Sequence, residues 1–385
     1  MQHSDVIIIG AGVIGSSIAY QLSCRGIKNT LVLDSGNAPG QGSTSKATGG
    51  FRSQFGSEMN IQLSLLARQK LLDFKDEHGI DPGYLQAGYL FLAQTNEEMK
   101  NLTLANSLQQ KNGVKDAILV SSDDIRKLNP HINMQNITGG SFCRSDGFIE
   151  PMNILNGYVS SSQSMGVKYI YNEQVTKLNC IGSKMDSIET PNGKFSADLY
   201  VNAAGAWAGS LAGLALEYLP VKHLKRQVCR IKEKNTFPAD TPMTIWVNSG
   251  FHFRMKDDHL ILLYPCVPEN NYNYDVTLEA SWLDKVMAIA KQNIPAANVL
   301  NADFEGSWAG LYEMSPDEHL ILGRSDFLEN FYYANGASGH GVMHSPAIGE
   351  LLANIICNKP NEIDVDILSP KRFTERKFIE QIHFF

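Results

Sequence analysis

Apolar and polar positions at the start of the chain predict a strand, a helix and a second strand. Residues 5–9 (DVIII) form a short β-branched run, which is typical of a strand buried on both faces. Apolar side chains then recur at helical spacing from Val13 to Leu22. Residues 30–34 (TLVLD) form a second apolar run that ends in an acid. Together these segments predict one complete βαβ unit.

Further along the chain, the pattern alternates between helical and strand-like periodicity. Helices are predicted at about 58–78, 153–165, 280–292 and 345–357. Short apolar runs predict strands at 88–92, 167–171, 174–178, 199–202 and 331–334. From about 220 to 305 strand-like alternation dominates and indicates an antiparallel sheet, with strands at 227–231, 244–247, 250–254 and 260–264. Ser345-Pro346 predicts the start of the last helix, because serine caps helices and proline is favoured in the first turn.

Composition narrows the class of protein without changing this picture. The 385 residues suit two domains, and 43% hydrophobic and 19% charged residues are ordinary values for a globular protein. The net charge of −7 and the lack of a basic run argue against nucleic-acid binding. No apolar stretch reaches the length of about 18 residues that a membrane-spanning helix needs, and we expect no signal peptide.

The six cysteines lie far apart along the chain, at positions 24, 143, 180, 229, 266 and 357, and form no C-x-x-C pair. We therefore expect neither a metal site nor a disulfide framework. Reduced, mostly buried thiols are typical of a cytoplasmic protein, and this is the location that we expect.

A glycine-rich turn connects the first strand to the first helix. Gly10, Gly12 and Gly15 fit the pattern G-x-G-x-x-G, in which the glycines allow a tight turn, approach of a pyrophosphate and close packing of helix on strand. The helix N-terminus then offers free N–H groups to phosphates. Asp34 ends the second strand, where an acid can accept hydrogen bonds from ribose hydroxyls. This pattern predicts a dinucleotide site but does not separate NAD from FAD.

Five further segments resemble motifs of a known family. They are 42–45 (GSTS), 49–56 (GGFRSQFG), 202–207 (NAAGAW), 310–317 (GLYEMSPD) and 336–343 (GASGHGVM). Together with the glycine turn they resemble, in the same order and over nearly the whole chain, the FAD-dependent D-amino-acid-oxidase-like enzymes. Segment 49–56 is most similar to the β subunits of sarcosine oxidases and proline dehydrogenases, and to glycine oxidase-type relatives.

The resemblance implies a mixed α/β and α+β fold. A doubly wound, Rossmann-like FAD-binding domain of the glutathione-reductase type is expected to be discontinuous, comprising 1–83, 149–218 and 306–385. An antiparallel β-sheet domain that binds the substrate is expected to comprise 84–148 and 219–305.

The resemblance also implies which residues bind FAD. Relatives with a covalently bound flavin use a histidine or a cysteine at positions that correspond here to Lys46 and Gly310, so non-covalent FAD is implied. The FAD-binding residues that we expect are Gly10, Gly12, Val13, Ile14, Gly15, Asp34, Ser35, Ser43, Thr44, Ser45, Gly49, Gly50, Val175, Ala203, Ala204, Gly205, Trp207, Gly310, Gly339, His340, Gly341, Val342 and Met343.

The family reaction moves a hydride from the carbon beside a nitrogen to flavin N5, and the resulting imine hydrolyses. This chemistry needs a cation that holds the substrate carboxylate, and arginine suits this role because its fork binds both oxygens. Arg52 follows the flavin loop, and Arg254 ends a predicted strand. These two arginines are the predicted anchors, with Tyr312, Tyr264 and His252 as further pocket residues.

Two departures from monomeric sarcosine oxidases affect the predicted substrate and electron acceptor. Met343 stands where those enzymes carry a carboxylate-binding lysine, and their oxygen-activating lysine has no match near 260–265. Lys256 is a displaced candidate for either role. The departures favour a dehydrogenase mildly, so both O₂ and an electron-acceptor protein remain possible oxidants.

The sequence therefore predicts an FAD-dependent oxidoreductase that acts on the C–N bond of a small (secondary) amino acid or amine. One alternative is oxidation of a C–O bond, in a 2-hydroxy acid or a glycerol-phosphate-like substrate. Another is a non-catalytic flavin-binding partner subunit. A homo- or hetero-oligomer is compatible with each of these functions.

Overall fold

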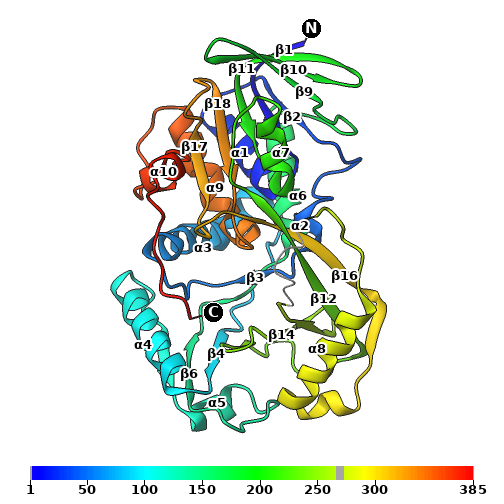
Figure 1. The fold of residues 1–385 in the computed structure, drawn as a ribbon, viewed down its shortest axis with the longest axis vertical. Coiled ribbons are helices and arrows are strands. Elements are labelled where there is room, and N and C mark those ends of the chain that lie inside the picture. Colours follow the sequence, from blue (N-terminus) through cyan, green and yellow to red (C-terminus); the bar gives the residue numbers. More distant parts are fainter. Residues whose placement is uncertain (1, 266–272, 385) are drawn as a thin grey trace.

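The computed structural model describes residues 2–265 and 273–384, and the chain forms two large sheets in two lobes (Figure 1). Strands β12 and β16 run from the upper lobe of Figure 1 into the lower one. The described residues form two eight-stranded sheets and one two-stranded sheet, in which β3 (Gly50–Phe51) pairs with β7 (Gly147–Phe148). The predicted combination of a parallel sheet with a mainly antiparallel sheet is confirmed, and β13 and β4 are the parallel neighbours of the second sheet.

The first sheet has β1 at its centre and the strand order β17-β18-β11-β1-β2-β8. All neighbours in this order are parallel except β17 and β18. The strands are β1 (Gln2–Ile9), β2 (Thr30–Leu33), β8 (Lys168–Ile170), β11 (Gly193–Asn202), β17 (Ile321–Arg324) and β18 (Phe331–Asn335). Strands β9 (Lys177–Ile181) and β10 (Lys184–Thr190) continue from β11 as an antiparallel extension.

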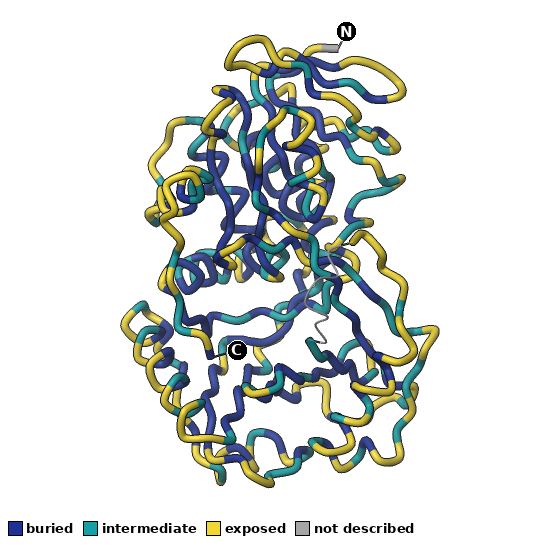
Figure 2. The backbone as a smooth tube through the Cα atoms, in the orientation of Figure 1, coloured by how far each residue is buried: buried dark blue, intermediate teal, exposed yellow. Residues whose placement is uncertain are grey.

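Side chains of β1 alternate between two hydrophobic cores because successive residues of a strand point to opposite faces. Val6 and Ile8 pack into the core formed with the helices α1 (Val13–Cys24), α3 (Glu58–His78), α6 (Pro151–Ser164) and α9 (Gly341–Ile356). Ile7 and Ile9 pack into the core formed with β9, β10 and α7 (Ala208–Gly213). Burial on both faces explains the unbroken apolar run of this strand. Figure 2 shows the contrast between these buried strands and the exposed turn of the β9–β10 hairpin.

The second sheet has the strand order β16-β12-β15-β14-β13-β4-β6-β5. Its strands are β4 (Tyr89–Ala93), β5 (Ala117–Val120), β6 (Gly139–Cys143), β12 (Lys222–Lys234), β13 (Met243–Trp246), β14 (His252–Lys256), β15 (His259–Leu263) and β16 (Ala302–Met314). Helix α8 (Ala280–Asn293) covers one face, where Trp282 and Val286 pack with Leu90 and Leu92. On the opposite face, Tyr89 and Phe91 pack in a separate core with α4 (Asn96–Lys111). The remaining short helices are α2 (Ser43–Lys46), α5 (Ser122–Leu128) and α10 (Lys371–Thr374), with the 3₁₀ turn η1 at Gly205–Trp207.

Two predicted elements need correction. The strand predicted at 174–178 starts instead at Lys177, so Val175 lies in the preceding loop. The last helix begins at Gly341 and not at Ser345, with Pro346 inside it. The proline is tolerated there because the Ser345 hydroxyl donates to the Val342 carbonyl at 2.8 Å, and this is the carbonyl that the missing N–H of Pro346 would have bonded.

Other sequence predictions stay predictions or extend beyond the described part of the chain. Strand β16 runs across the boundary predicted between 305 and 306, and the domain boundaries stay predictions. Cys24, Cys143, Cys180, Cys229 and Cys357 are free thiols, and Cys266 lies outside the described residues. Within 2–265 and 273–384, no helix is both long and apolar enough to cross a membrane.

Helices α1 and α9 cross so closely that the contact admits only a glycine. The Ser17 hydroxyl donates to the Ser345 carbonyl at 2.8 Å. A Cβ atom on Gly349 would lie 2.1 Å from Ser17 Oγ and 2.7 Å from the Ser17 carbonyl carbon. This contact is important for the cofactor site because the N-termini of both helices contribute to it.

We predict that Gly349→Ala destabilises the protein by about 1–3 kcal/mol, because overpacking forces the two helices apart. The measurement is the midpoint of chemical unfolding, compared with that of Gly213→Ala. A Cβ on Gly213 meets nothing within 4 Å, so this control in helix α7 should be neutral or slightly stabilising. An equal effect of both substitutions would contradict the proposed role of the crossing.

Candidate active site

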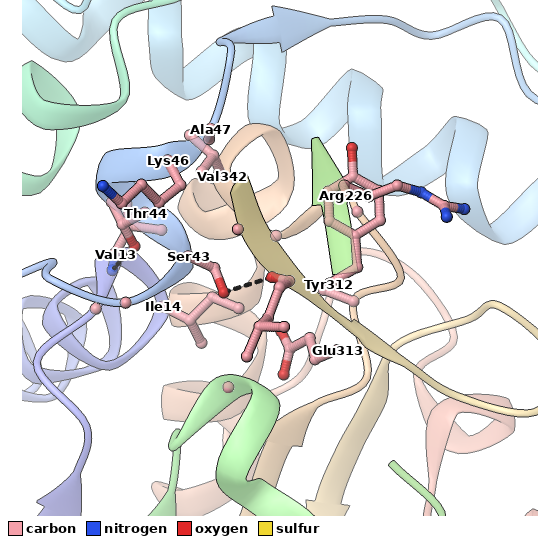
Figure 3. Close-up of a pocket in the computed structure, with 18 of the residues that line it drawn as sticks. Val13, Ile14, Ser43, Thr44, Lys46, Ala47, Arg226, Tyr312, Glu313 and Val342 are labelled. Carbon is pink, nitrogen blue, oxygen red and sulfur yellow. Dashed lines mark hydrogen bonds between the residues drawn. The ribbon is translucent and has the colours of Figure 1, made fainter. Parts of the chain in front are cut away.

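A cavity of about 1160 Å³ lies between the two large sheets, and residues of both line it. Three features shape its first end: the N-terminus of α1, the loop before and within α2, and the turn that follows β11. The face of the antiparallel sheet opposite α8 forms the wall of its second end. Figure 3 shows side chains from α1, α2, β12, β16 and α9 around this space.

The glycine turn after β1 has the geometry that its three glycines require. Gly10 has a φ of +116°, and a Cβ there would lie 2.3 Å from the Ala203 carbonyl oxygen. A Cβ on Gly15 would lie 2.0 Å from the Gly10 carbonyl oxygen. A Cβ on Gly12 would instead project into space bounded only by Thr44 Oγ1 at 3.4 Å. The second glycine therefore leaves room above the start of α1, as a pyrophosphate requires.

The small residues of α2 connect this loop to helix α1 and to strand β16 of the second sheet. The Thr44 hydroxyl accepts a hydrogen bond from the Val13 N–H at 3.2 Å. The Ser43 hydroxyl donates to the Leu311 carbonyl of β16 at 2.7 Å, as Figure 3 shows. Ser45 does not line the cavity, and its hydroxyl lies 3.4 Å from the Gly42 carbonyl. Ser43 and Thr44 therefore fix the position of the loop, which leaves its backbone facing the cavity.

Two acids lie at the first end of the cavity. Asp34 accepts hydrogen bonds from the Ala11 and Gly36 N–H groups, both at 2.7 Å. Glu173 was not predicted from the sequence. Its Oε1 accepts from Asn192 Nδ2 at 3.0 Å, whereas its buried Oε2 has no hydrogen-bond partner among the described residues. An orphaned carboxylate oxygen beside Asp34 is suited to accept a hydrogen bond from a hydroxyl group of a bound ligand.

The N-terminus of α9 lines the same cavity. His340 is its N-cap residue and makes no side-chain capping hydrogen bond, and α1 likewise has no side-chain cap. Gly339 has a φ of +90°, and a Cβ there would lie 2.5 Å from the Tyr312 ring. Two helix N-termini therefore direct N–H groups and positive dipole into one space, which favours a ligand with negative charge.

Tyr312 and Glu313 are neighbours on β16 and point in opposite directions (Figure 3). Tyr312 points to the side where Arg226 lies. Glu313 is buried below α9, where its Oε2 accepts from the Gly336 N–H at 3.1 Å. Burial raises the pKa of Glu313 to about 7, and the hydrogen bonds from Gly336 and Ala337 oppose this rise. Sequence reasoning did not identify Glu313 because its burial depends on the packing of β16 against the turn after β18.

The wall of the second end is a row of side chains across adjacent antiparallel strands. Val228, Leu263, His252 and Ile245 are register partners on β12, β15, β14 and β13. All four line the cavity, as do Arg226 on β12 and Tyr89 on β4. The wall is therefore mostly apolar, with a few polar groups that converge from different strands.

Both histidines of the second end are held in their neutral form. His252 Nδ1 lies 2.7 Å from the Gly250 carbonyl, which only accepts, so the proton is on Nδ1. Burial lowers the pKa of His252 to about 4, and the positive charges of Arg52 and Arg226 contribute to the shift. Burial and the nearby Arg52 lower the pKa of His340 well below its ordinary value. The positive charge of this region therefore comes from arginine.

Arg52, which the sequence predicts as a carboxylate anchor, lines the second end of the cavity. Its Nη1 donates to the Gln54 carbonyl at 2.8 Å, and its Nη2 lies 3.4 Å from His340 Nε2. The guanidinium carbon lies 4.0 Å from the centre of the Phe55 ring. Burial lowers the pKa of Arg52 to about 10, which leaves it charged at neutral pH.

Arg226 is a second cavity arginine that the sequence prediction missed. The predicted strand began at 227, whereas β12 begins at Lys222 and places Arg226 on its cavity face. Its guanidinium carbon lies 5.6 Å from the centre of the Tyr312 ring. Only the alternation of side chains along a strand could have indicated that Arg226 faces the cavity. That inference required the correct first residue of the predicted strand.

Arg254, the other predicted anchor, does not line the cavity. Its Nη1 donates to the carbonyls of Thr48 and Gly49 at 2.5 and 3.1 Å, and its Nε donates to that of Met255 at 2.9 Å. Its guanidinium carbon lies 3.7 Å from the centre of the Phe148 ring. These contacts correct the prediction that Arg254 anchors the substrate carboxylate, because the guanidinium supports the cofactor loop from behind. Lys256 likewise forms an ion pair with Glu150 at 3.0 Å and does not line the cavity.

The structure thus brings most of the predicted site residues to one cavity. Of those predicted, Gly15, Ser45 and Arg254 do not line it. The predicted residues that line it are Gly10, Gly12, Val13, Ile14, Asp34, Ser35, Ser43, Thr44, Gly49, Gly50, Arg52, Val175, Ala203, Ala204, Gly205, Trp207, His252, Tyr264, Gly310, Tyr312, Gly339, His340, Gly341, Val342 and Met343.

This fold and cavity define a dinucleotide-binding oxidoreductase with a separate substrate wall. The pattern of the family described as FAD dependent oxidoreductase matches residues 5–355, and the chain belongs to this family. Its cofactor is FAD. The uncapped helix N-termini, the open space above Gly12 and the orphaned Glu173 oxygen fit the pyrophosphate and hydroxyl groups of this cofactor.

Three relatives illustrate the range of similar proteins. FAD-dependent oxidoreductase domain-containing protein 1 of Xenopus laevis is 30% identical over 92% of this chain and 79% of its own length. Rat mitochondrial dimethylglycine dehydrogenase is 26% identical over 96% of this chain, but over only 45% of its own length. The crystal structure of L-proline dehydrogenase from P. horikoshii superposes with a TM-score of 0.90 at 26% identity, covering 98% of this chain and 99% of that one.

We predict that Gly12→Val yields protein without bound flavin, because the new side chain would fill the space above the start of α1. The measurement is flavin absorbance per polypeptide after purification. Gly193→Val is the control, since a Cβ at that position meets nothing within 4 Å. A Gly12→Val protein with a full complement of FAD would contradict the assignment of this turn.

We predict that Arg254→Met weakens FAD binding by about tenfold, because it removes the donors to the Thr48 and Gly49 carbonyls. The dissociation constant is measured by fluorescence titration of the apoprotein with FAD. Arg230→Met is a matched control, because Arg230 pairs with Asp303 away from the cavity. Unchanged FAD affinity in a folded Arg254→Met protein would contradict the supporting role.

Proposed function

We propose that the protein oxidises the C–N bond of a small secondary amino acid or amine. The observation that carries this proposal is the second end of the cavity, where arginines and neutral histidines face an apolar wall. The printed names of two relatives, L-proline dehydrogenase and dimethylglycine dehydrogenase, support the same class of reaction. We also propose that FAD is bound non-covalently, because Lys46 and Gly310 occupy the positions that carry a covalent link in some relatives.

In this proposal, Arg52 orients the substrate through its carboxylate. A guanidinium binds a carboxylate with two parallel hydrogen bonds, which fixes direction as well as distance. Arg52 is held from behind by the Gln54 carbonyl and the Phe55 ring, so little of its own freedom is lost on binding. Tyr312 and Tyr264 lie on the same cavity and limit how the remaining part of the substrate can be placed.

The charge of the pocket prepares the amine for oxidation. An amine must lose its extra proton before the neighbouring carbon can release a hydride. Nearby positive charges lower the pKa of an ammonium group, and Arg52 and Arg226 supply such charges. Neutral His252 and His340 add no further positive charge to the pocket.

When bound, FAD accepts the hydride at flavin N5. The N-terminus of α9, at His340 and Gly341, would stabilise negative charge that develops on the ring. The apolar wall formed by Val228, Leu263 and Ile245 limits water around the reacting carbon. The imine product then hydrolyses in water and needs no catalytic group of the protein.

We predict that an amine from a defined panel bleaches the flavin under anaerobic conditions. The panel is sarcosine, dimethylglycine, glycine, L- and D-proline and D-alanine, with glycerol 3-phosphate and 2-hydroxyglutarate as C–O substrates. Arg52→Ala should raise KM for the active amino acid by about tenfold or more, with FAD content unchanged, because it removes a charge-assisted bidentate contact. Arg144→Ala, at an exposed position away from the cavity, is the control.

The outcomes of this panel separate the candidate functions. Bleaching only by a hydroxy compound would replace the proposal with C–O oxidation. If the flavin stays oxidised with every compound, this would contradict the proposal for these substrates and favour a flavin-binding partner subunit. If a compound does bleach the flavin, the rate at which air reoxidises it would distinguish an oxidase from a dehydrogenase that passes electrons to a protein. Unchanged kinetics of Arg52→Ala would remove Arg52 from the substrate site.

A further inference from the structure

Arg226 is half-buried, and no described carboxylate forms an ion pair with it. Its Nη1 is buried and has no hydrogen-bond partner among residues 2–265 and 273–384. The guanidinium lies beside the Tyr312 ring (Figure 3), and in the described chain no carboxylate lies within ion-pair distance of Arg226. Removing a guanidinium from water without pairing it is costly, so such a group in a cavity indicates an anionic ligand.

The neighbours of Arg226 leave its guanidinium accessible from the cavity. Its register partner on β16 is Gly310, which has no side chain to cover it. The acid that acts on it through space is Glu318, which is exposed and accepts a hydrogen bond from Gln381 Nε2 at 2.8 Å. Glu318 therefore reduces the net charge of the region but does not occupy the hydrogen-bonding positions of Arg226.

Arg226 and Arg52 line the same part of the cavity. The Arg226 guanidinium lies 5.6 Å from the centre of the Tyr312 ring, and Arg52 Nη2 lies 3.4 Å from Nε2 of His340, which follows Gly339 beside that ring. The positive charges of both arginines lower the pKa of His252, and both are influenced by Tyr312 and Glu318. They come from separate parts of the fold, since Arg52 follows β3 and Arg226 lies on β12. A substrate whose single carboxylate is bound by Arg52 would leave Arg226, whose buried Nη1 has no partner among the described residues, without an anion.

We propose that the substrate is a secondary amino acid with two carboxylates, one bound by Arg52 and the other by Arg226. This inference rests on the proposed function, because it concerns the same site and the same C–N oxidation. The nitrogen lies between the two carboxylates, or beside one of them, so that the carbon to be oxidised faces the flavin. The reaction still removes one hydride and one proton from the C–N unit, with FAD as the oxidant.

The first test compares matched substrates that differ by one carboxylate. Sarcosine is compared with iminodiacetate, and N-methylalanine with N-methylaspartate, by reduction of an artificial electron acceptor. We expect kcat/KM to be at least about tenfold higher for the dicarboxylates, because one additional charge-assisted contact contributes about this factor. Arg226→Met should abolish this preference, whereas Arg226→Lys should retain part of it because it keeps the charge and loses the fork.

The second test measures binding without turnover. Thiodiacetate and (methylthio)acetate replace the amine nitrogen by sulfur and differ by one carboxylate, and their binding is followed by the change in flavin absorbance. The wild type should bind thiodiacetate at least about tenfold more tightly than (methylthio)acetate. The Arg226→Met variant should bind the two compounds equally. Arg230→Met, on the same strand, should keep the difference, and FAD content should be unchanged in every variant.

The outcomes distinguish this inference from the proposed function. Equal binding of the two thioethers by the wild type would overturn the assignment of Arg226, even if amines are oxidised. A difference that survives in Arg226→Met would also overturn it. Tight binding of thiodiacetate without oxidation of any amine would instead support the dicarboxylate site and contradict the proposed C–N oxidation.

Discussion

Four parallel strands of the first sheet end at one edge, and every other feature of the site depends on this arrangement. The first residue after β1 is Gly10, after β2 Asp34, after β11 Ala203 and after β18 Gly336. These strands run in the same direction, so their following turns meet where a dinucleotide binds. The close contacts of Gly10 with Ala203, and of Gly15 with Gly10, keep α1 directed at that edge.

The long strands β12 and β16 connect this edge to the substrate wall (Figure 1). Their pairing places Tyr312 and Arg226 in the second sheet while Ser43 bonds to Leu311 from the cofactor loop. The cofactor loop and the substrate wall are therefore joined by direct hydrogen bonds and share a boundary. A shift of either sheet would change the position of the substrate relative to the flavin, because the reacting atoms must lie within contact distance.

Arginine has two different tasks in this site, and its surroundings decide between them. Arg254 is buried with its Nη1 and Nε bound to backbone carbonyls and its face on Phe148, so it acts as a structural support. Arg226 is half-buried, and its buried Nη1 has no hydrogen-bond partner among the described residues. Both side chains are charged and both follow a strand pattern. The difference lies in which carbonyls and rings the folded chain brings to each guanidinium.

The sequence by itself determined the βαβ unit, the dinucleotide turn and the family, because these depend on local periodicity and on glycines at fixed spacing. It also identified most residues that line the cavity, since they belong to contiguous motifs. Only the tertiary structure decided the surroundings of Arg254 and Arg226 and the start of the last helix at Gly341. Strand register and the packing of distant segments control these features, and a single sequence contains no local signal for either. Pro346 misled the prediction for the same reason, because the hydroxyl of Ser345 satisfies the Val342 carbonyl only in the folded helix.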